Sequence, residues 1–194
     1  MRRSLIITLL GPDRTGLVDA VAARIAAVGA NWVESKLTRL AGHFAGVVRV
    51  DADPDAVDPL RRSLDGLTDE GLTVHIALAD EPDPATPADP ATALRVVFVG
   101  HDRPGIVRDI AHALADLGVN VDDLATSVTS APMTGEPMFT AAVLARRPPG
   151  IDPAALIDRL EALAADCDLD LAVDPPDLGP AADPDARLSH GAHP

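Results

Sequence analysis

Apolar residues recur along the chain in a pattern that predicts the same succession of strands and helices twice. Two short apolar runs, residues 5–10 and 94–99, have the length and β-branched content of buried strands. After each run the spacing changes to that of one helical face, marked by Leu17, Val21, Ile25 and Val28 in the first case and by Ile106, Ile110, Leu114 and Leu117 in the second. Each helix is expected to stop at a glycine, Gly29 or Gly118.

The rest of each half predicts a hairpin, a second helix and a closing strand. The extended stretches that form the hairpins are residues 32–40 with 44–50, joined by a tight turn at Gly42, and residues 123–129 with 138–145, joined by a longer loop. Alternating apolar residues mark the final strands, at 72–78 and 169–173. The resulting order, βαββαβ twice, is the split βαβ or ferredoxin-like plan.

Three prolines sharpen the expected helix starts. The second helix of each half is expected to begin at Asp58-Pro59 and at Asp152-Pro153, because aspartate caps helices and proline suits the first turn. Pro104 is likewise expected in the first turn of its helix.

The two halves are copies of one domain. Residues 11–18, Gly-Pro-Asp-Arg-Thr-Gly-Leu-Val, return as residues 100–107, Gly-His-Asp-Arg-Pro-Gly-Ile-Val, at an offset of 89 that also relates Asn31 to Asn120. We therefore predict an α+β protein of two tandem ferredoxin-like domains, each an antiparallel sheet with its helices on one face. The expected division is domain 1 at 1–80, a Pro-rich acidic linker at 81–92, domain 2 at 93–175 and a disordered tail at 176–194.

Charge and composition exclude several classes of function. Sixteen basic residues against 30 acidic ones give a net charge of −14, which repels the phosphate backbone and disfavours direct binding of nucleic acid. The apolar start of the chain is too short for a membrane span, and the single cysteine, Cys167, fits a reducing compartment. We expect a cytoplasmic protein that binds neither nucleic acid nor membrane.

The repeated signature has the skeleton of a phosphate-binding loop without its chemistry. Leu17-Val18 and Ile106-Val107 stand where a lysine and a hydroxyl residue would be needed for nucleotide hydrolysis. His101 and His112 lack converging metal ligands, and no serine lies in a nucleophile elbow. The pairs Arg61-Arg62 and Arg146-Arg147 are interpreted as solvated surface. We predict no catalytic residue, no metal site and no cofactor.

What remains at the signature suits a free amino acid. Exposed N–H groups at a helix start can bind a carboxylate, and Asp13 or Asp102 can receive the ammonium group. Asn31 or Asn120 is expected nearby, brought there by the turn from helix to strand. The alternative is purely structural: each aspartate caps its helix, and each asparagine takes a left-handed turn conformation. For any one of these residues alone, the structural role is the simpler interpretation.

The succession of strand, Gly-x-Asp-Arg-[Thr/Pro]-Gly-[Leu/Ile]-Val, helix and Gly-x-Asn resembles the ACT domain, a ligand-binding module of amino-acid metabolism. Two such domains, together with the segment 130–139, are most similar to the glycine cleavage system transcriptional repressor group. The resemblance implies that an effector binds at an interface between domains, at Asp13, Arg14, Thr15, Gly16 and Asn31, and at Asp102, Arg103, Pro104, Gly105 and Asn120. The copies differ at Pro12 and His101 and at Thr15 and Pro104, so that one copy can bind while the other is structural.

We therefore expect a non-catalytic regulator, a homodimer in keeping with the resemblance, that senses an amino acid, with glycine or serine as the suggested effector. Binding would favour one domain arrangement and change the surface offered to a regulatory protein partner. Two alternatives stay open: a constitutive oligomerisation module without a ligand, and a small transferase or hydrolase on the same fold.

Overall fold

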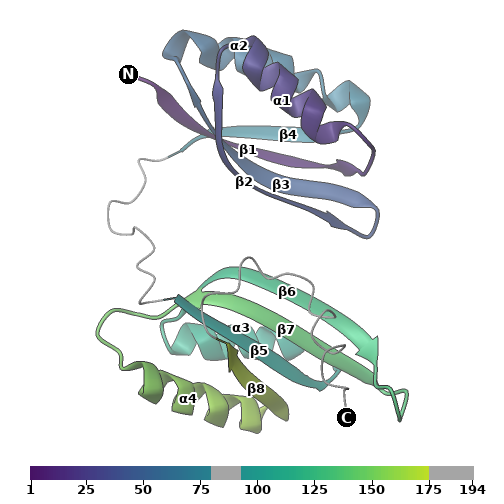
Figure 1. Ribbon diagram of the computed structural model, residues 1–194, viewed down its shortest axis with the longest axis vertical. Coiled ribbons are helices and arrows are strands. Elements are labelled where there is room, and N and C mark those ends of the chain that lie inside the picture. Colours follow the sequence, from purple (N-terminus) through teal and green to yellow (C-terminus); the bar gives the residue numbers. More distant parts are fainter. Residues whose placement is uncertain (80–92, 175–194) are drawn as a thin grey trace, which may run out of the picture. The chain divides into compact units, whose positions relative to one another are not determined.

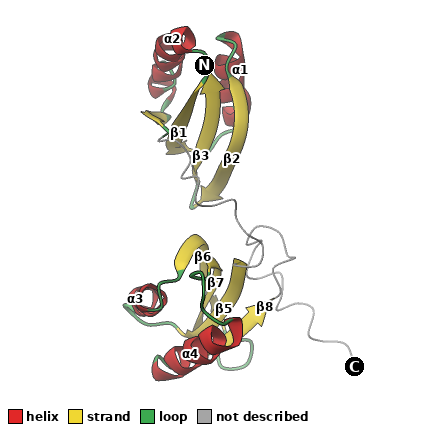
Figure 2. Cartoon of the chain, turned by 90° about the vertical axis from the view of Figure 1, so that its left-hand side faces the viewer, coloured by secondary structure: helices red, strands yellow, loops and turns green. Residues whose placement is uncertain are grey.

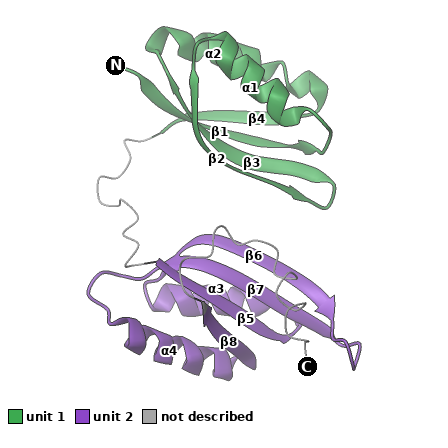
Figure 3. Ribbon diagram, viewed as in Figure 1, with its two compact units in different colours: residues 1–85 green, residues 86–194 purple. Residues whose placement is uncertain are grey.

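The computed structural model describes residues 1–79 and 93–174, and the chain divides into two compact units, Met1–Ala85 and Thr86–Pro194 (Figure 3). The expected linker at 81–92 and the expected tail at 176–194 lie outside the described residues. Each unit is described by itself.

The two units contain the predicted elements in the predicted order (Figure 1). The first consists of β1 (Arg3–Pro12), α1 (Leu17–Ala27), β2 (Asn31–Leu40), β3 (His43–Ala52), α2 (Pro54–Asp65), the short 3₁₀ helix η1 (Thr68–Glu70) and β4 (Thr73–Leu78). The second consists of β5 (Ala93–His101), α3 (Ile106–Asp116), β6 (Asn120–Ser130), β7 (Pro137–Arg146), α4 (Pro153–Asp166) and β8 (Leu169–Asp174).

Each unit has one antiparallel sheet whose first strand is central. The strand orders are β2-β3-β1-β4 and β6-β7-β5-β8. In the first sheet Thr8 of β1 faces Val47 of β3 on one side and His75 of β4 on the other. Both helices of a unit lie over the same face of its sheet (Figures 1 and 2). The α+β, ferredoxin-like plan of the sequence prediction is confirmed in both units.

The face of the sheet that the helices cover forms the core. Leu5 and Ile7 of β1 are fully buried together with Val21 of α1 and Leu60 of α2. In the second unit Val96 of β5 takes the same place, packed with the α4 residues Leu156 and Leu160 among others. Burial of each large apolar side chain contributes about 1.5–3 kcal/mol, so these two clusters are the main source of stability in each unit.

Two of the expected helix starts are wrong. Helix α2 begins at Pro54 with Asp53 as N-cap, and Pro59 lies inside it. Asp53-Pro54 carries the same start signal about one turn earlier, and burial of Val57 stabilises the helix at that end. Pro104 precedes the N-cap Gly105 and so lies outside its helix. The start of α4 is confirmed, because the Asp152 carboxylate accepts a hydrogen bond from the Ala155 N–H at 3.0 Å.

The first hairpin turn is as tight as predicted. Strand β2 ends at Leu40 and β3 begins at His43, so that only Ala41 and Gly42 connect them. Both have positive φ, 48° and 79°, as a two-residue hairpin turn that follows the twist of the strands requires.

No helix in the described parts of the chain is long and apolar enough to cross a membrane.

The first glycine of each signature is required by packing. A Cβ atom on Gly11 would lie 2.5 Å from the carbonyl oxygen of Gly71, where the chain enters β4. A Cβ atom on Gly100 would lie 2.5 Å from Leu169 Cδ2 and 2.9 Å from the Asp168 carbonyl oxygen. These glycines therefore allow the last strand to approach the central one.

Gly11→Ala is expected to destabilise the first unit by about 1–3 kcal/mol, because the new methyl group meets backbone rather than a flexible side chain. Urea unfolding followed by Trp32 fluorescence reports on this unit, since Trp32 is the only tryptophan and packs against its core. Gly66→Ala is the control: its φ of −62° is ordinary and its nearest neighbour would be 3.5 Å away, so a gain of about 0.4–1 kcal/mol is expected. A Gly11→Ala midpoint equal to that of the wild type would contradict the packing role.

Candidate functional site

The two signature loops leave the central strands at equivalent places. Asp13 directly follows β1, and its N–H donates to the carbonyl oxygen of Gly42 at 2.9 Å. Asp102 directly follows β5, and its N–H donates to the carbonyl oxygen of Pro137 at the same distance. Each loop is thereby attached to the tip of the neighbouring hairpin, which holds the aspartate at one end of the sheet.

The helix starts behind the loops have no side-chain cap. Gly16 and Gly105 are the N-cap residues, both with a φ of 89°, and no side chain accepts a hydrogen bond from the first turn of either helix. The suggestion that Asp13 and Asp102 cap their helices is therefore wrong. The second signature glycine is needed for its left-handed backbone. The N–H groups of Val18 and Asp19, and those of Val107 and Arg108, remain available to an anion, whereas the Ile106 N–H donates to the Arg103 carbonyl oxygen at 3.4 Å.

Thr15 and Pro104 occupy the position before these glycines in an exposed turn, where each lies directly beside the helix start.

The two signature aspartates differ in their partners. The Asp13 Oδ2 atom lies 2.8 Å from Nε of Arg39 on β2. The Asp102 carboxylate makes no hydrogen bond or ion pair with any other residue that the structure describes. An exposed pair such as Asp13–Arg39 is worth about 0–1 kcal/mol, so a ligand ammonium could replace the guanidinium at little cost.

The signature arginines also differ. Arg14 Nη2 lies 2.6 Å from Glu70 Oε2, and Arg24 Nη2 lies 2.6 Å from Glu70 Oε1, so one carboxylate joins the loop to α1 and η1. Arg103 Nη1 instead lies 2.8 Å from Asp109 Oδ2, in the first turn of its own helix. The loop of the first unit is tied to a distant part of the chain, whereas the loop of the second is tied locally.

The two asparagines lie at the other end of the sheet from the aspartates. Asn31 pairs with Asp51, which pairs with Ser4 near the start of β1. Asp13 lies nine positions further along, about 30 Å at 3.3 Å per residue. Asn120 pairs with Arg146, and Arg146 with Ala93 at the start of β5. The expectation that each asparagine lies near its own aspartate is wrong, because the helix returns the chain to the end where the strand began.

The asparagines are also not in the left-handed region. Among non-glycine residues that the structure describes, only Ala41 and Asp168 have positive φ, while Gly29 and Gly118 supply the turns with φ of 71° and 68°. Asn31 and Asn120 are the first residues of β2 and β6. The proposed structural role for these residues is therefore wrong as well.

Asn120 belongs to a polar cluster that the sequence analysis missed. Its Nδ2 donates to Asp122 Oδ1 at 2.8 Å, and Nε and Nη2 of Arg146 lie 2.9 and 2.7 Å from the same oxygen. These contacts contradict the interpretation of Arg146 as solvated surface. The spacing Asn-x-Asp is a local signal for the first contact, whereas the arginine lies 24 residues further along the chain.

Comparison with known proteins places both units in one family. Residues 3–77 and residues 94–165 each match the ACT domain. The chain belongs to the ACT-domain family. Among curated proteins, a comparison by sequence finds no match.

Two solved structures are similar to the tandem ACT chain over nearly its whole length. An unknown protein from Galdieria sulphuraria is 22% identical, with a TM-score of 0.76, over 90% of this chain and 98% of that one. A proposed glycine cleavage system transcriptional repressor is 19% identical, with a TM-score of 0.70, over 90% and 97%. At this identity the likeness shows the fold.

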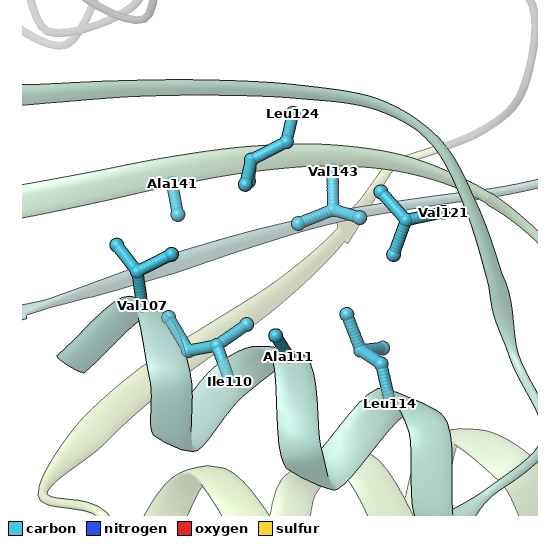
Figure 4. A pocket seen from close by; sticks show the side chains of 8 residues that line it. All are labelled: Val107, Ile110, Ala111, Leu114, Val121, Leu124, Ala141 and Val143. Atoms are coloured by element: carbon cyan, nitrogen blue, oxygen red, sulfur yellow. The ribbon is translucent and has the colours of Figure 1, made fainter. Parts of the chain in front are cut away.

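An apolar groove in the second ACT domain is a poor site for an amino acid. It lies between α3 and strands β6 and β7 and is lined by Val107, Ile110, Ala111, Leu114, Val121, Leu124, Ala141 and Val143 (Figure 4). None of these side chains can pair with a carboxylate or an ammonium group, and burying such groups unpaired is costly. The first domain has Trp32 at the position of Val121, packed against its core.

No three histidine, cysteine or acidic side chains of residues 1–79 and 93–174 converge on a point that could hold a metal ion. His101 Nδ1 lies 3.8 Å from Glu136 Oε2, and His112 Nε2 lies 3.6 Å from Asp116 Oδ2. Each of these two histidines therefore faces a single carboxylate.

Two arginine partners shift the pKa of the Glu70 carboxyl group. Hydrogen bonds from the guanidinium groups of Arg14, first, and Arg24, second, hold the pKa of its carboxyl below the ordinary value of 4.5. A lowered pKa in the folded state means that the contact stabilises the protein above the ordinary pKa and is lost as pH falls through the folded-state value.

We expect the Glu70 carboxyl carbon, followed by NMR, to titrate below pH 4.5, and we expect Arg14→Gln and Arg24→Gln each to move the midpoint upward. The difference in stability between wild type and Glu70→Gln should shrink as the carboxylate protonates at acid pH. A wild-type midpoint at or above 4.5 would show that the two arginines do not hold this group.

Proposed function

We propose that this tandem ACT protein is a non-catalytic sensor of a free amino acid, which it binds through the signature loops. The observation that carries the proposal is the pairing, in both domains, of an aspartate with a helix start that no side chain caps. The N–H groups suit the ligand carboxylate, and the aspartate suits its ammonium group. The resemblance to ACT domains, as ligand-binding modules of amino-acid metabolism, supports the same choice.

The positions of the asparagines bear on how the ligand is held. A free amino acid is far shorter than the roughly 30 Å of strand between an aspartate and the asparagine of its own domain. A ligand that touches both kinds of residue must take them from two different domains. We propose that it does so, which makes binding dependent on the association of domains, and that a homodimer supplies that association.

The likeness to one solved structure suggests which process is regulated. A solved structure of the same fold is a proposed glycine cleavage system transcriptional repressor, which favours glycine or serine as the effector and amino-acid metabolism as the target. With a net charge of −14, the chain should act on transcription through a protein partner rather than on DNA itself. A preference of the ligand for one domain arrangement by about 1–3 kcal/mol is enough for such regulation.

A constitutive interaction module is the second candidate. The apolar groove of Figure 4 favours it, because its rim exposes about 40% of Val107, Val121 and Leu124. A partner that covered this apolar surface would be stabilised by its burial. This candidate requires no ligand and predicts the same association of chains in its presence and absence.

The sensor proposal predicts a ligand-dependent rise in melting temperature. In a thermal-shift screen of the proteinogenic amino acids, a ligand at a hundred times its dissociation constant adds about 2.7 kcal/mol of apparent stability. Asp13→Ala or Asp102→Ala should abolish the response, whereas Asp158→Ala, which removes the same charge from the exposed face of α4, should keep it. A flat response to every amino acid would favour the interaction module.

Association is expected to respond to the same ligand. Light scattering should give the mass of two chains, and without the effective amino acid the dimer should dissociate at a higher protein concentration than in its presence. A monomer at every concentration, with and without glycine or serine, would exclude a site shared between chains.

A further inference from the structure

Three donors converge on a single oxygen atom at the start of β6. Asp122 Oδ1 accepts from Asn120 Nδ2 at 2.8 Å and lies 2.9 and 2.7 Å from Nε and Nη2 of Arg146. The Asp122 and Arg146 side chains are 28% and 34% exposed, so the pair is partly shielded from water. Such shielding strengthens a charged hydrogen bond relative to one on the open surface.

A β-bulge places the aspartate in this position. The register shifts between Val121, opposite Ala145, and Asp123, opposite Leu144, so that Asp122 is the extra residue of the bulge. Asn120 stays in register with Arg146. The side chains of Asn120, Asp122 and Arg146 are therefore gathered at one corner of the sheet.

The chemistry of the aspartate decides which way the amide of Asn120 faces. An ionised carboxylate only accepts hydrogen bonds, so Asn120 must turn its NH₂ group toward Asp122. Its Oδ1 atom accepts no hydrogen bond from the described residues. Asn120 thus presents an acceptor, which suits a ligand N–H group and does not suit a ligand carboxylate.

The first domain has the same bulge without the cluster. Its register shifts between Trp32 and Glu34, which leaves Val33 at the place of Asp122. The residue opposite Asn31 is Asp51 rather than an arginine. Asn31 makes no side-chain hydrogen bond with the described residues, so nothing among them sets the direction of its amide.

We infer that Asp122, held by Arg146, is a positioning residue that fixes Asn120 as the hydrogen-bond acceptor for the amino group of the effector. The inference rests on the proposed function for the existence of an amino-acid effector. It assigns parts to two residues, Asp122 and Arg146, that lie outside the signature.

The positioning role is tested without any ligand. In the ¹⁵N-labelled full chain, the side-chain amide of Asn120 should have a high heteronuclear NOE, which reports restricted motion on the ps–ns timescale. Asp122→Ala should lower it, whereas Asp123→Ala, which removes the same charge one residue further along, should leave it unchanged. A well-dispersed spectrum shows that each variant folds. An NOE that is equal in all three proteins overturns the inference.

The acceptor role is tested with glycine and with betaine, its N,N,N-trimethyl derivative, which keeps both charges but has no N–H group. Calorimetric titration should show glycine binding weakened about tenfold by Asp122→Ala, the size expected for one hydrogen bond, and unchanged by Asp123→Ala. Asp122→Asn keeps an acceptor oxygen, so its affinity for glycine should lie between those of the wild type and Asp122→Ala. Betaine binding should respond equally to Asp122→Ala and Asp123→Ala.

The outcomes separate the inference from the proposed function. If Asp122→Ala weakens glycine and betaine alike, or neither, the acceptor role is wrong while sensing of glycine stands. If glycine does not bind the wild type, the glycine-sensing proposal and the acceptor role both fall, and the NOE comparison alone decides whether Asp122 holds Asn120.

Discussion

The crossover from β1 through α1 to β2 decides which residues of an ACT domain can meet. Strand and helix run in opposite directions, so the chain arrives at Asn31 beside the start of β1, while Asp13 remains at its end. The same geometry separates Asp102 from Asn120. A small ligand cannot contact both residues of one domain, because it does not reach from one end of the sheet to the other.

Within that common frame, the two domains have different polar contacts. In the first, Asp13 pairs with Arg39, and Arg14 shares Glu70 with Arg24. The charged side chains of the loop therefore form ion pairs within their own domain. In the second, Asp102 has no partner among the described residues, while Asn120 is held in place at the other end. Duplication kept the fold and the glycines that it needs, and the charged side chains around them diverged.

Local signals account for the parts of the fold that could be predicted. The turn at Ala41-Gly42, the helical face at Leu17, Val21 and Ile25, and the cap at Asp152 each depend on residues within a few positions of one another. The start of α2 was misplaced because two Asp-Pro pairs carry the same signal and only packing chooses between them.

The candidate site was less predictable, because its contacts join residues far apart in sequence. Glu70 lies 56 residues from Arg14, and Arg146 lies 24 residues from Asp122. No spacing rule connects such pairs, whose meeting depends on the tertiary fold. The place of Asn31 relative to Asp13 was misjudged for a related reason: the residues between them fold as a helix with a length and direction of its own.

The most direct test of the account is to map the bound amino acid on the assigned NMR spectrum of the full chain. Titration with glycine is predicted to shift the backbone amides of a helix start, Val107 and Arg108 or Val18 and Asp19, and also the side-chain amide of Asn120 at the other end of its domain. Shifts at both ends would show that a ligand takes its contacts from two domains. Shifts confined to one end, or to the apolar groove beside α3, would contradict a site shared between them.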